Sequence, residues 1–141
     1  VSEPPPHVPE NIAKIYNEGE QSLNGECFNA AAAMFRLCID LSSKQILADN
    51  DSSDANNRQK NMLKPRLEYL LEKGYIPNAL SELMDSIRED GNDGAHDGSL
   101  EKEDALDLKD FTYILLERIY SEPAKLEEAK RRREERRAEA A

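Results

Sequence analysis

Hydrophobic residues recur at helical spacing along most of the chain after residue 8. The first such segment opens at Pro9 and ends at the breaker Asn24-Gly25, and the second covers residues 26–48. The apolar positions of these two segments are Ile12, Ile15, Tyr16 and Leu23, and Phe28, Ala31, Phe35, Cys38, Ile39 and Ile46. The second segment is apolar around much of its circumference, so we predict that it is the central, most buried helix. Its alanine-rich first half should let a neighbouring helix approach closely.

Three more helices follow from the same spacing. They run from about Lys60 to Gly74, from Pro77 to Gly91 and from about Glu101 to Tyr120. Their inward positions are Leu63, Leu67, Leu70 and Leu71, then Leu80, Leu83, Met84 and Ile87, then Ala105, Leu108, Thr112, Leu115 and Ile119. Gly74 is expected to end its helix in a left-handed conformation, and Ser99 or a neighbour to cap the last one.

The remaining segments are polar or rich in proline. Residues 49–59 contain no large apolar side chain, and we predict an exposed, mobile loop. Residues 1–8 carry three consecutive prolines and are predicted to form a linker. Glu122-Pro123 is expected to interrupt the fifth helix, and residues 124–141 to form a charged helix that projects or frays unless a partner meets it. The chain therefore predicts an all-α bundle of about five helices over residues 9–123, with a linker before it and a helical tail after it.

Charge divides unevenly between the bundle and the tail. The chain has 141 residues, with 19 Lys+Arg and 29 Asp+Glu, which gives a formal charge of −10. Residues 1–123 hold 12 basic and 24 acidic residues, a balance of −12, while residues 124–141 hold 7 and 5, a balance of +2. An acidic average surface repels phosphate, so nucleic acid is not expected to coat the whole protein. The tail is the place where a phosphate backbone would be favoured.

Several classes of protein are excluded by composition. No apolar run approaches the roughly 20 residues that span a bilayer, and the N-terminus lacks a secretory signal, so we expect a cytoplasmic protein with no membrane contact. Cys27 and Cys38 lie eleven positions apart in one predicted helix, about 16 Å, which a disulfide cannot bridge. The only histidines are His7 and His96, so no zinc-type cluster exists, and we expect neither metal nor cofactor. The chain begins with Val rather than Met, which suggests part of a longer protein.

Candidate chemistry is concentrated in the glycine-rich segment after the fourth predicted helix. Arg88 precedes this segment, Asn92 lies within it, and His96 is the only histidine inside the predicted bundle. An arginine can bind phosphate through its planar donors, and a histidine can act as general acid or base near neutral pH. Together they suit metal-independent RNA cleavage, in which the 2′-hydroxyl attacks the adjacent phosphorus and arginine stabilises the charged intermediate.

A structural interpretation of the same segment stays open. Asn92 and His96 can hydrogen-bond the backbone groups that end one helix and begin the next, while Arg88 pairs with a nearby carboxylate. Four acidic residues surround the segment and favour this interpretation, because they repel RNA and favour a protonated His96. These residues are Glu89, Asp90, Asp93 and Asp97.

A calcium-binding loop is not supported by the same segment. Asp90, Asn92 and Glu101 fall on positions 1, 3 and 12 of the helix-loop-helix calcium pattern. Position 5 is Gly94, where an oxygen ligand is needed, and position 6 is Ala95, where the turn needs glycine. We therefore expect no metal there.

Four ordered blocks resemble a known family. They are Asn-Ala-Ala-Ala-Ala-Met-Phe-Arg at 29–36, Leu-Glu-Tyr-Leu-Leu-Glu-Lys-Gly-Tyr-Ile-Pro at 67–77, Ile-Arg-(x)3-Asn-(x)2-Ala-His at 87–96, and Glu-Asp-Ala at 103–105. Over roughly residues 9–129 this order resembles domain of unknown function 4145. That family is grouped with the HEPN-like helical domains of prokaryotes, which occur alone, fused to restriction-enzyme subunits, or in toxin–antitoxin and phage-defence settings.

The resemblance implies a helical bundle that often forms a homodimer. In active HEPN members an Arg and a His from both protomers form a metal-independent ribonuclease site, which would make Arg88 the phosphate-stabilising residue, His96 the catalytic histidine and Asn92 a supporting polar residue. Here more residues separate the Arg from the His than active members usually have. We therefore favour a non-catalytic dimerisation and interaction module of a prokaryotic defence or accessory protein, with an RNA or protein partner. The alternative is a ribonuclease of toxin or phage-defence type that acts through Arg88 and His96 across a dimer interface.

Overall fold

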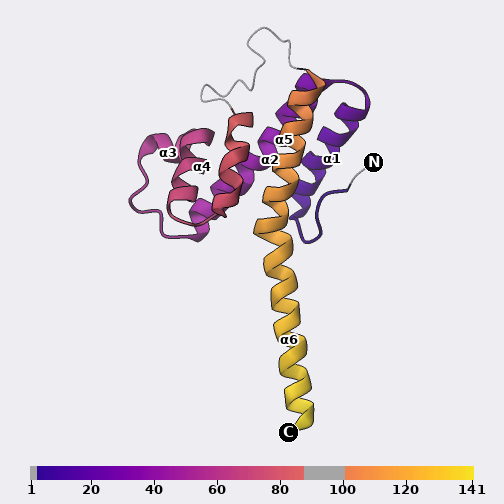
Figure 1. The fold of residues 1–141 in the computed structure, drawn as a ribbon, viewed down its shortest axis with the longest axis vertical. Helices are drawn as coiled ribbons and strands as arrows, with labels where there is room; N and C mark the ends of the chain where they lie inside the picture. Colours follow the sequence, from indigo (N-terminus) through magenta and orange to yellow (C-terminus); the bar gives the residue numbers. More distant parts are fainter. Residues whose placement is uncertain (1–2, 88–100) are drawn as a thin grey trace.

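The described part of the chain is helical, as predicted. The computed structural model describes residues 3–87 and 101–141, and no strand occurs among them (Figure 1). The elements are α1 (Glu10–Asn24), α2 (Phe28–Asp49), α3 (Asn57–Asn61), α4 (Leu63–Glu72), the 3₁₀ helix η1 (Asn78–Ser86), α5 (Lys102–Leu116), the π-helical turn η2 (Glu117–Ser121) and α6 (Glu122–Ala140). The all-α bundle with a long C-terminal helix is confirmed.

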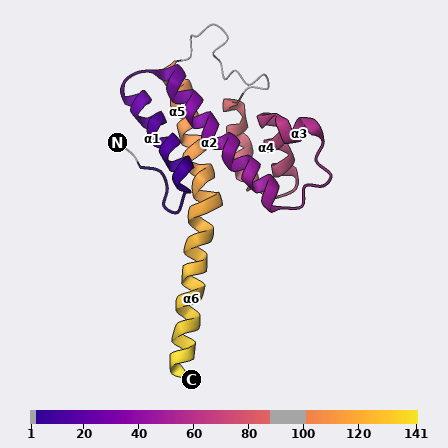
Figure 2. The same cartoon turned by 180° about the vertical axis from the view of Figure 1, so that it is seen from behind.

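Helix α2 is the centre of the bundle. It packs against α1, α5 and α4, and Figures 1 and 2 show α1 and α5 on one side of it and α3 and α4 on the other. Most predicted inward positions are buried, including Phe35 and Ile39 of α2, Leu67 of α4 and Leu115 of α5. The predicted inward residues that are only partly buried are Ile15, Leu23, Phe28, Leu71, Leu83 and Ile119. Aliphatic burial at the predicted spacing therefore builds this core.

Helices α1 and α2 approach closely at a glycine. A Cβ atom placed on Gly19 would lie 2.8 Å from Cε1 of Phe35, so only glycine leaves room for that ring. Phe35 also contacts the Tyr16 ring edge-on, with centroids 5.4 Å apart and planes inclined by 63°. This close approach therefore depends on a glycine of α1, whereas the sequence pattern placed it at the alanines of α2.

The region between α2 and α5 is more broken than the hydrophobic pattern predicts. Helix begins at Asn57 rather than near Lys60, and an extended residue, Met62, separates α3 from α4. The 3₁₀ helix η1 replaces the α-helix expected from Pro77, although it still buries Leu80 and Met84.

Gly74 ends α4 as predicted, in the left-handed conformation with φ of 75°. Its N–H donates to the carbonyl of Leu71, and the N–H of Tyr75 donates to the carbonyl of Leu70. These two bonds form a Schellman motif, which satisfies the last carbonyls of the helix.

The last helix is continuous, so the predicted interruption at Glu122-Pro123 is wrong. The π turn η2 joins α5 to α6, and Pro123 lies directly after this turn, in the first turn of α6. Helix α6 projects away from the bundle in both views, and none of its residues is buried (Figures 1 and 2). Leu126 is 59% exposed.

The proline-rich N-terminal segment lies against the base of this projecting helix. Pro5 is buried, and the Ser121 hydroxyl donates to the carbonyl of Pro6. His7 lies 3.6 Å from Glu128 of α6. These contacts fix which face of α6 turns toward the rest of the chain.

Candidate functional site

The three residues predicted to carry chemistry, Arg88, Asn92 and His96, lie outside the described residues. The structure describes the two edges of their segment. Ile87 is 1% exposed, and its N–H donates to the carbonyl of Met84 at 3.0 Å. Glu101 is the N-cap of α5, and its N–H donates to Oδ2 of Asp104 at 3.1 Å. Both edges lie at the end of the bundle opposite α6 (Figure 1).

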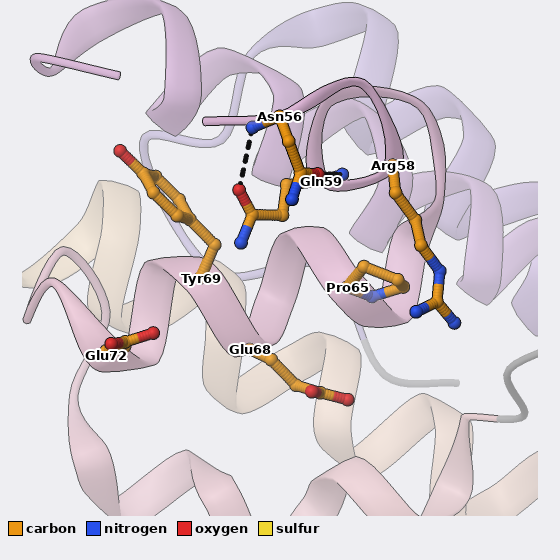
Figure 3. A pocket seen from close by; sticks show the side chains of 7 residues that line it. All are labelled: Asn56, Arg58, Gln59, Pro65, Glu68, Tyr69 and Glu72. Atoms are coloured by element: carbon orange, nitrogen blue, oxygen red, sulfur yellow. Dashed lines mark hydrogen bonds between the residues drawn. The ribbon is translucent and has the colours of Figure 1, made fainter. Parts of the chain in front are cut away.

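A polar pocket of about 200 Å³ lies between α3 and α4 (Figure 3). Its lining residues come from the N-cap and first turn of α3 and from α4. They are Asn56, Arg58, Gln59, Pro65, Glu68, Tyr69 and Glu72. Arg58 is the one cationic side chain of the lining, and the two glutamates are anionic.

Local sequence explains the α3 wall of the pocket. The Asn56 side chain accepts from the N–H of Gln59 at 2.8 Å, and the Gln59 side chain accepts from the N–H of Asn56 at 2.8 Å. This reciprocal cap starts a helix of only one turn and fixes both amides at the pocket mouth. Pro65 occupies the first turn of α4, where its missing N–H is tolerated.

The α4 wall is joined to the preceding loop by a hydrogen-bonded cluster. The Tyr69 hydroxyl donates to Asp54, and Lys73 pairs with the same carboxylate. The hydrogen bond to Asp54 raises the pKa of Tyr69 to about 12, while the bonds from Lys73 and Tyr69 lower the pKa of Asp54. Near neutral pH the phenol therefore keeps its proton, and the carboxylate stays ionised.

The loop between α2 and α3 has further contacts. The Tyr75 hydroxyl donates to the carbonyl of Asp51 at 2.7 Å, the Ser52 hydroxyl donates to the carbonyl of Leu47 at 2.9 Å, and Ala55 is 6% exposed. Most of residues 50–56 is exposed as predicted, but several side chains hold the loop to the bundle.

A buried ion pair lies between α2 and α4. Arg66 is fully buried and donates to Asp40 at 2.8 Å, to the Ser43 hydroxyl at 3.0 Å and to the carbonyl of Lys60 at 3.1 Å. Burial alone would raise the pKa of Asp40, but the hydrogen bonds from Arg66 and Lys44 lower it below its usual value. This pair joins α2, α3 and α4 and so holds the α3–α4 pocket on the bundle.

The side chains that line the α3–α4 pocket are mostly polar or charged. The pocket lining contains neither histidine nor cysteine. Burial raises the pKa of the Cys38 thiol to about 12, which keeps it protonated and unreactive. Within residues 3–87 and 101–141, no group of three or more His, Cys, Asp or Glu is placed to hold a metal ion. In the same residues, no helix combines the length and apolar character that crossing a membrane requires.

The buried pair was not predicted from the sequence, although a signal for it exists. Arg66 occupies the second position of the spacing Leu63, Arg66, Leu67, Leu70, which is otherwise entirely apolar. A charge on such a stripe indicates a buried partner, because an unpaired buried charge is costly. Asp40, directly after the buried Ile39, is that partner.

Comparison with known proteins gives one positive finding. A family model described as "Domain of unknown function (DUF4145)" matches residues 17–135. No curated protein matches the chain, and no solved structure does.

Proposed function

We propose that this chain, which belongs to the DUF4145 family, is a non-catalytic, HEPN-like dimerisation and interaction module of a cytoplasmic prokaryotic defence or accessory protein. The observation that carries the proposal is α6. It has 19 residues, none of which is buried, and Leu126 is 59% exposed. A helix that contributes no buried residue to the core of its own bundle is suited to contact a partner. The polar and charged lining of the α3–α4 pocket also suits contact with a partner.

The dimerisation part rests on the family resemblance and is tested by molar mass. Light scattering after size exclusion, at micromolar concentration, should give 2 × 16.0 kDa, about 32 kDa, for the intact chain. A mass of one chain at every concentration up to about 100 μM, well above the Kd of a stable dimer, would refute dimerisation.

The non-catalytic part is tested against the ribonuclease alternative. Intact protein incubated with varied RNAs in EDTA should produce no 2′,3′-cyclic phosphate ends, because the acidic residues around His96 repel the RNA backbone. His7→Ala is the matched control for His96→Ala, since both remove one histidine. Cleavage that His96→Ala and Arg88→Ala abolish and His7→Ala retains would overturn the proposal and establish the ribonuclease.

A further inference from the structure

Charge is segregated around the circumference of α6. At about 100° per residue, six of its seven basic side chains fall within one half of the helix. They are Lys125, Lys130, Arg132, Arg133, Arg136 and Arg137. The opposite half carries five of the six glutamates, and the two exceptions are Arg131 on the acidic face and Glu122 on the basic face. We call the first half, which also includes Leu126 and Ala129, the basic face.

The basic face points away from the rest of the protein. The partly buried residues of α6 are Ala124 and Glu128, and Glu128 lies 3.6 Å from His7 of the N-terminal segment. Both belong to the acidic half of the helix. Leu126, about half a turn from them, is 59% exposed, and every residue from Ala129 onward is exposed. The contacts at the base of α6 therefore turn its cations outward.

We propose that the basic face of α6 binds the phosphate backbone of double-stranded DNA. This inference rests on the proposed function, since it names the partner that the projecting helix meets. Pairing with α6 of a second copy is disfavoured, because the face that would form the contact carries Arg133 and Arg136. Leu126, Ala129 and Ala140 are the apolar residues of the face, too few for a helix that lies in a membrane surface.

The dimensions of the helix suit a DNA duplex. Lys125 and Arg137 are twelve residues apart, about 18 Å along the helix, which spans about five phosphates of one strand. An α-helix about 10–12 Å wide fits the major groove of B-form DNA, whereas the major groove of an RNA duplex is too narrow. Helix α6 has no aromatic side chain on which single-stranded bases could stack.

Projection also separates these cations from the acidic bundle. Residues 1–123 carry a formal charge of −12, which would repel DNA near the bundle surface. Lys130 lies eight residues beyond Glu122, about 12 Å along the helix, and the screening length at physiological ionic strength is about 8 Å. The distal part of the basic face can therefore bind phosphate, because salt screens most of the repulsion between the acidic bundle and the DNA.

The test measures binding of the intact chain to a fluorescent 20-base-pair DNA duplex of arbitrary sequence by polarisation. Arg133→Glu on the basic face and Arg131→Glu on the acidic face are matched, since both change one exposed arginine of the same helix by two charges. Arg133→Glu should weaken DNA binding about tenfold. It should also reduce the slope of log affinity against log salt concentration by about one, the loss of about one phosphate contact, while the affinity of Arg131→Glu should stay within about threefold of the wild type. Circular dichroism checks that both variants keep the helix.

Three results would overturn the inference. They are no duplex binding at 50 mM salt, equal effects of the two variants, and tighter binding of single-stranded DNA, duplex RNA or poly-glutamate than of the DNA duplex. The mass measurement separates this inference from the proposed dimer. A dimer that ignores DNA refutes the inference alone, and a monomer that binds DNA through Arg133 refutes dimerisation alone.

Discussion

Asp40→Asn should strongly destabilise the bundle, because it leaves a buried arginine without its counter-ion. The Arg66 side chain is 0% exposed and the Asp40 side chain is 25% exposed, and Nη1 of Arg66 lies 2.8 Å from Oδ1 of Asp40. Removing one partner of a buried pair costs about 3–5 kcal/mol, and partial exposure of Asp40 places the cost at about 3 kcal/mol. The uncharged acceptors that remain, the Ser43 hydroxyl and the carbonyl of Lys60, do not neutralise the guanidinium. For a domain of this size the melting temperature should fall by about 10 °C.

The assay is urea unfolding at pH 7 followed by circular dichroism, with Lys44→Gln as the matched control. Lys44 contacts the other oxygen of Asp40 at 3.0 Å but is 53% exposed, so its removal should cost only about 0.5 kcal/mol. An Asp40→Asn variant as stable as Lys44→Gln would refute the burial argument.

The Asp40–Arg66 pair also predicts that the free energy of unfolding falls at acid pH. The folded-state pKa of Asp40 is lowered from its ordinary value of 3.8, so the ionised carboxylate stabilises the protein above pH 3.8. This contribution is lost as pH falls through the folded-state pKa, where the wild-type carboxyl also becomes neutral. The difference in unfolding free energy between wild type and Asp40→Asn should therefore shrink below pH 3.8. A difference that stays constant into acid would contradict this assignment.

Two further substitutions test the packing around α1 and the loop before α3. Gly19→Ala gains about 1 kcal/mol of helix propensity, but its Cβ would lie 2.8 Å from buried Phe35, and overpacking costs about 1–3 kcal/mol. Urea unfolding should show a net loss of about 1 kcal/mol, against no more than about 0.5 kcal/mol for Gly25→Ala, whose nearest contact would be 3.5 Å; equal values would refute the steric argument. Tyr69→Phe removes the hydroxyl that holds Asp54, so hydrogen exchange of residues 50–56 should accelerate, and unchanged exchange would show that the bond does not order this loop.

The core was predictable from the sequence because it depends on repeated burial along each helix. Spacing alone identified Phe35, Leu67 and Leu115 as inward positions, and all three are fully buried. The Gly74 stop was predictable for a similar reason, since left-handed backbone strongly favours glycine. Both features can be predicted from a residue and its near neighbours in the sequence.

The features that were missed depend on partners far away in sequence. Arg66 meets Asp40 across 26 positions, and Tyr69 meets Asp54 across 15. Hydrophobic periodicity contains no information about such pairs, so the sequence predicted an exposed, mobile loop before α3. The Arg88, Asn92 and His96 site stays a prediction, because its residues lie outside the described parts of the chain.

The π turn explains both the wrong prediction at Pro123 and the orientation of α6. In η2 the N–H of Glu122 donates to the carbonyl of Glu117, five residues back instead of four. The wider turn accommodates a proline ring that would clash with a carbonyl in a regular α-helix, so the helix continues where sequence rules predict a stop. One extra residue in a turn also rotates everything after it by about 100°. That rotation directs Glu128 toward His7 and leaves Arg133 facing outward, so the turn that removes the break also orients the basic face away from the bundle.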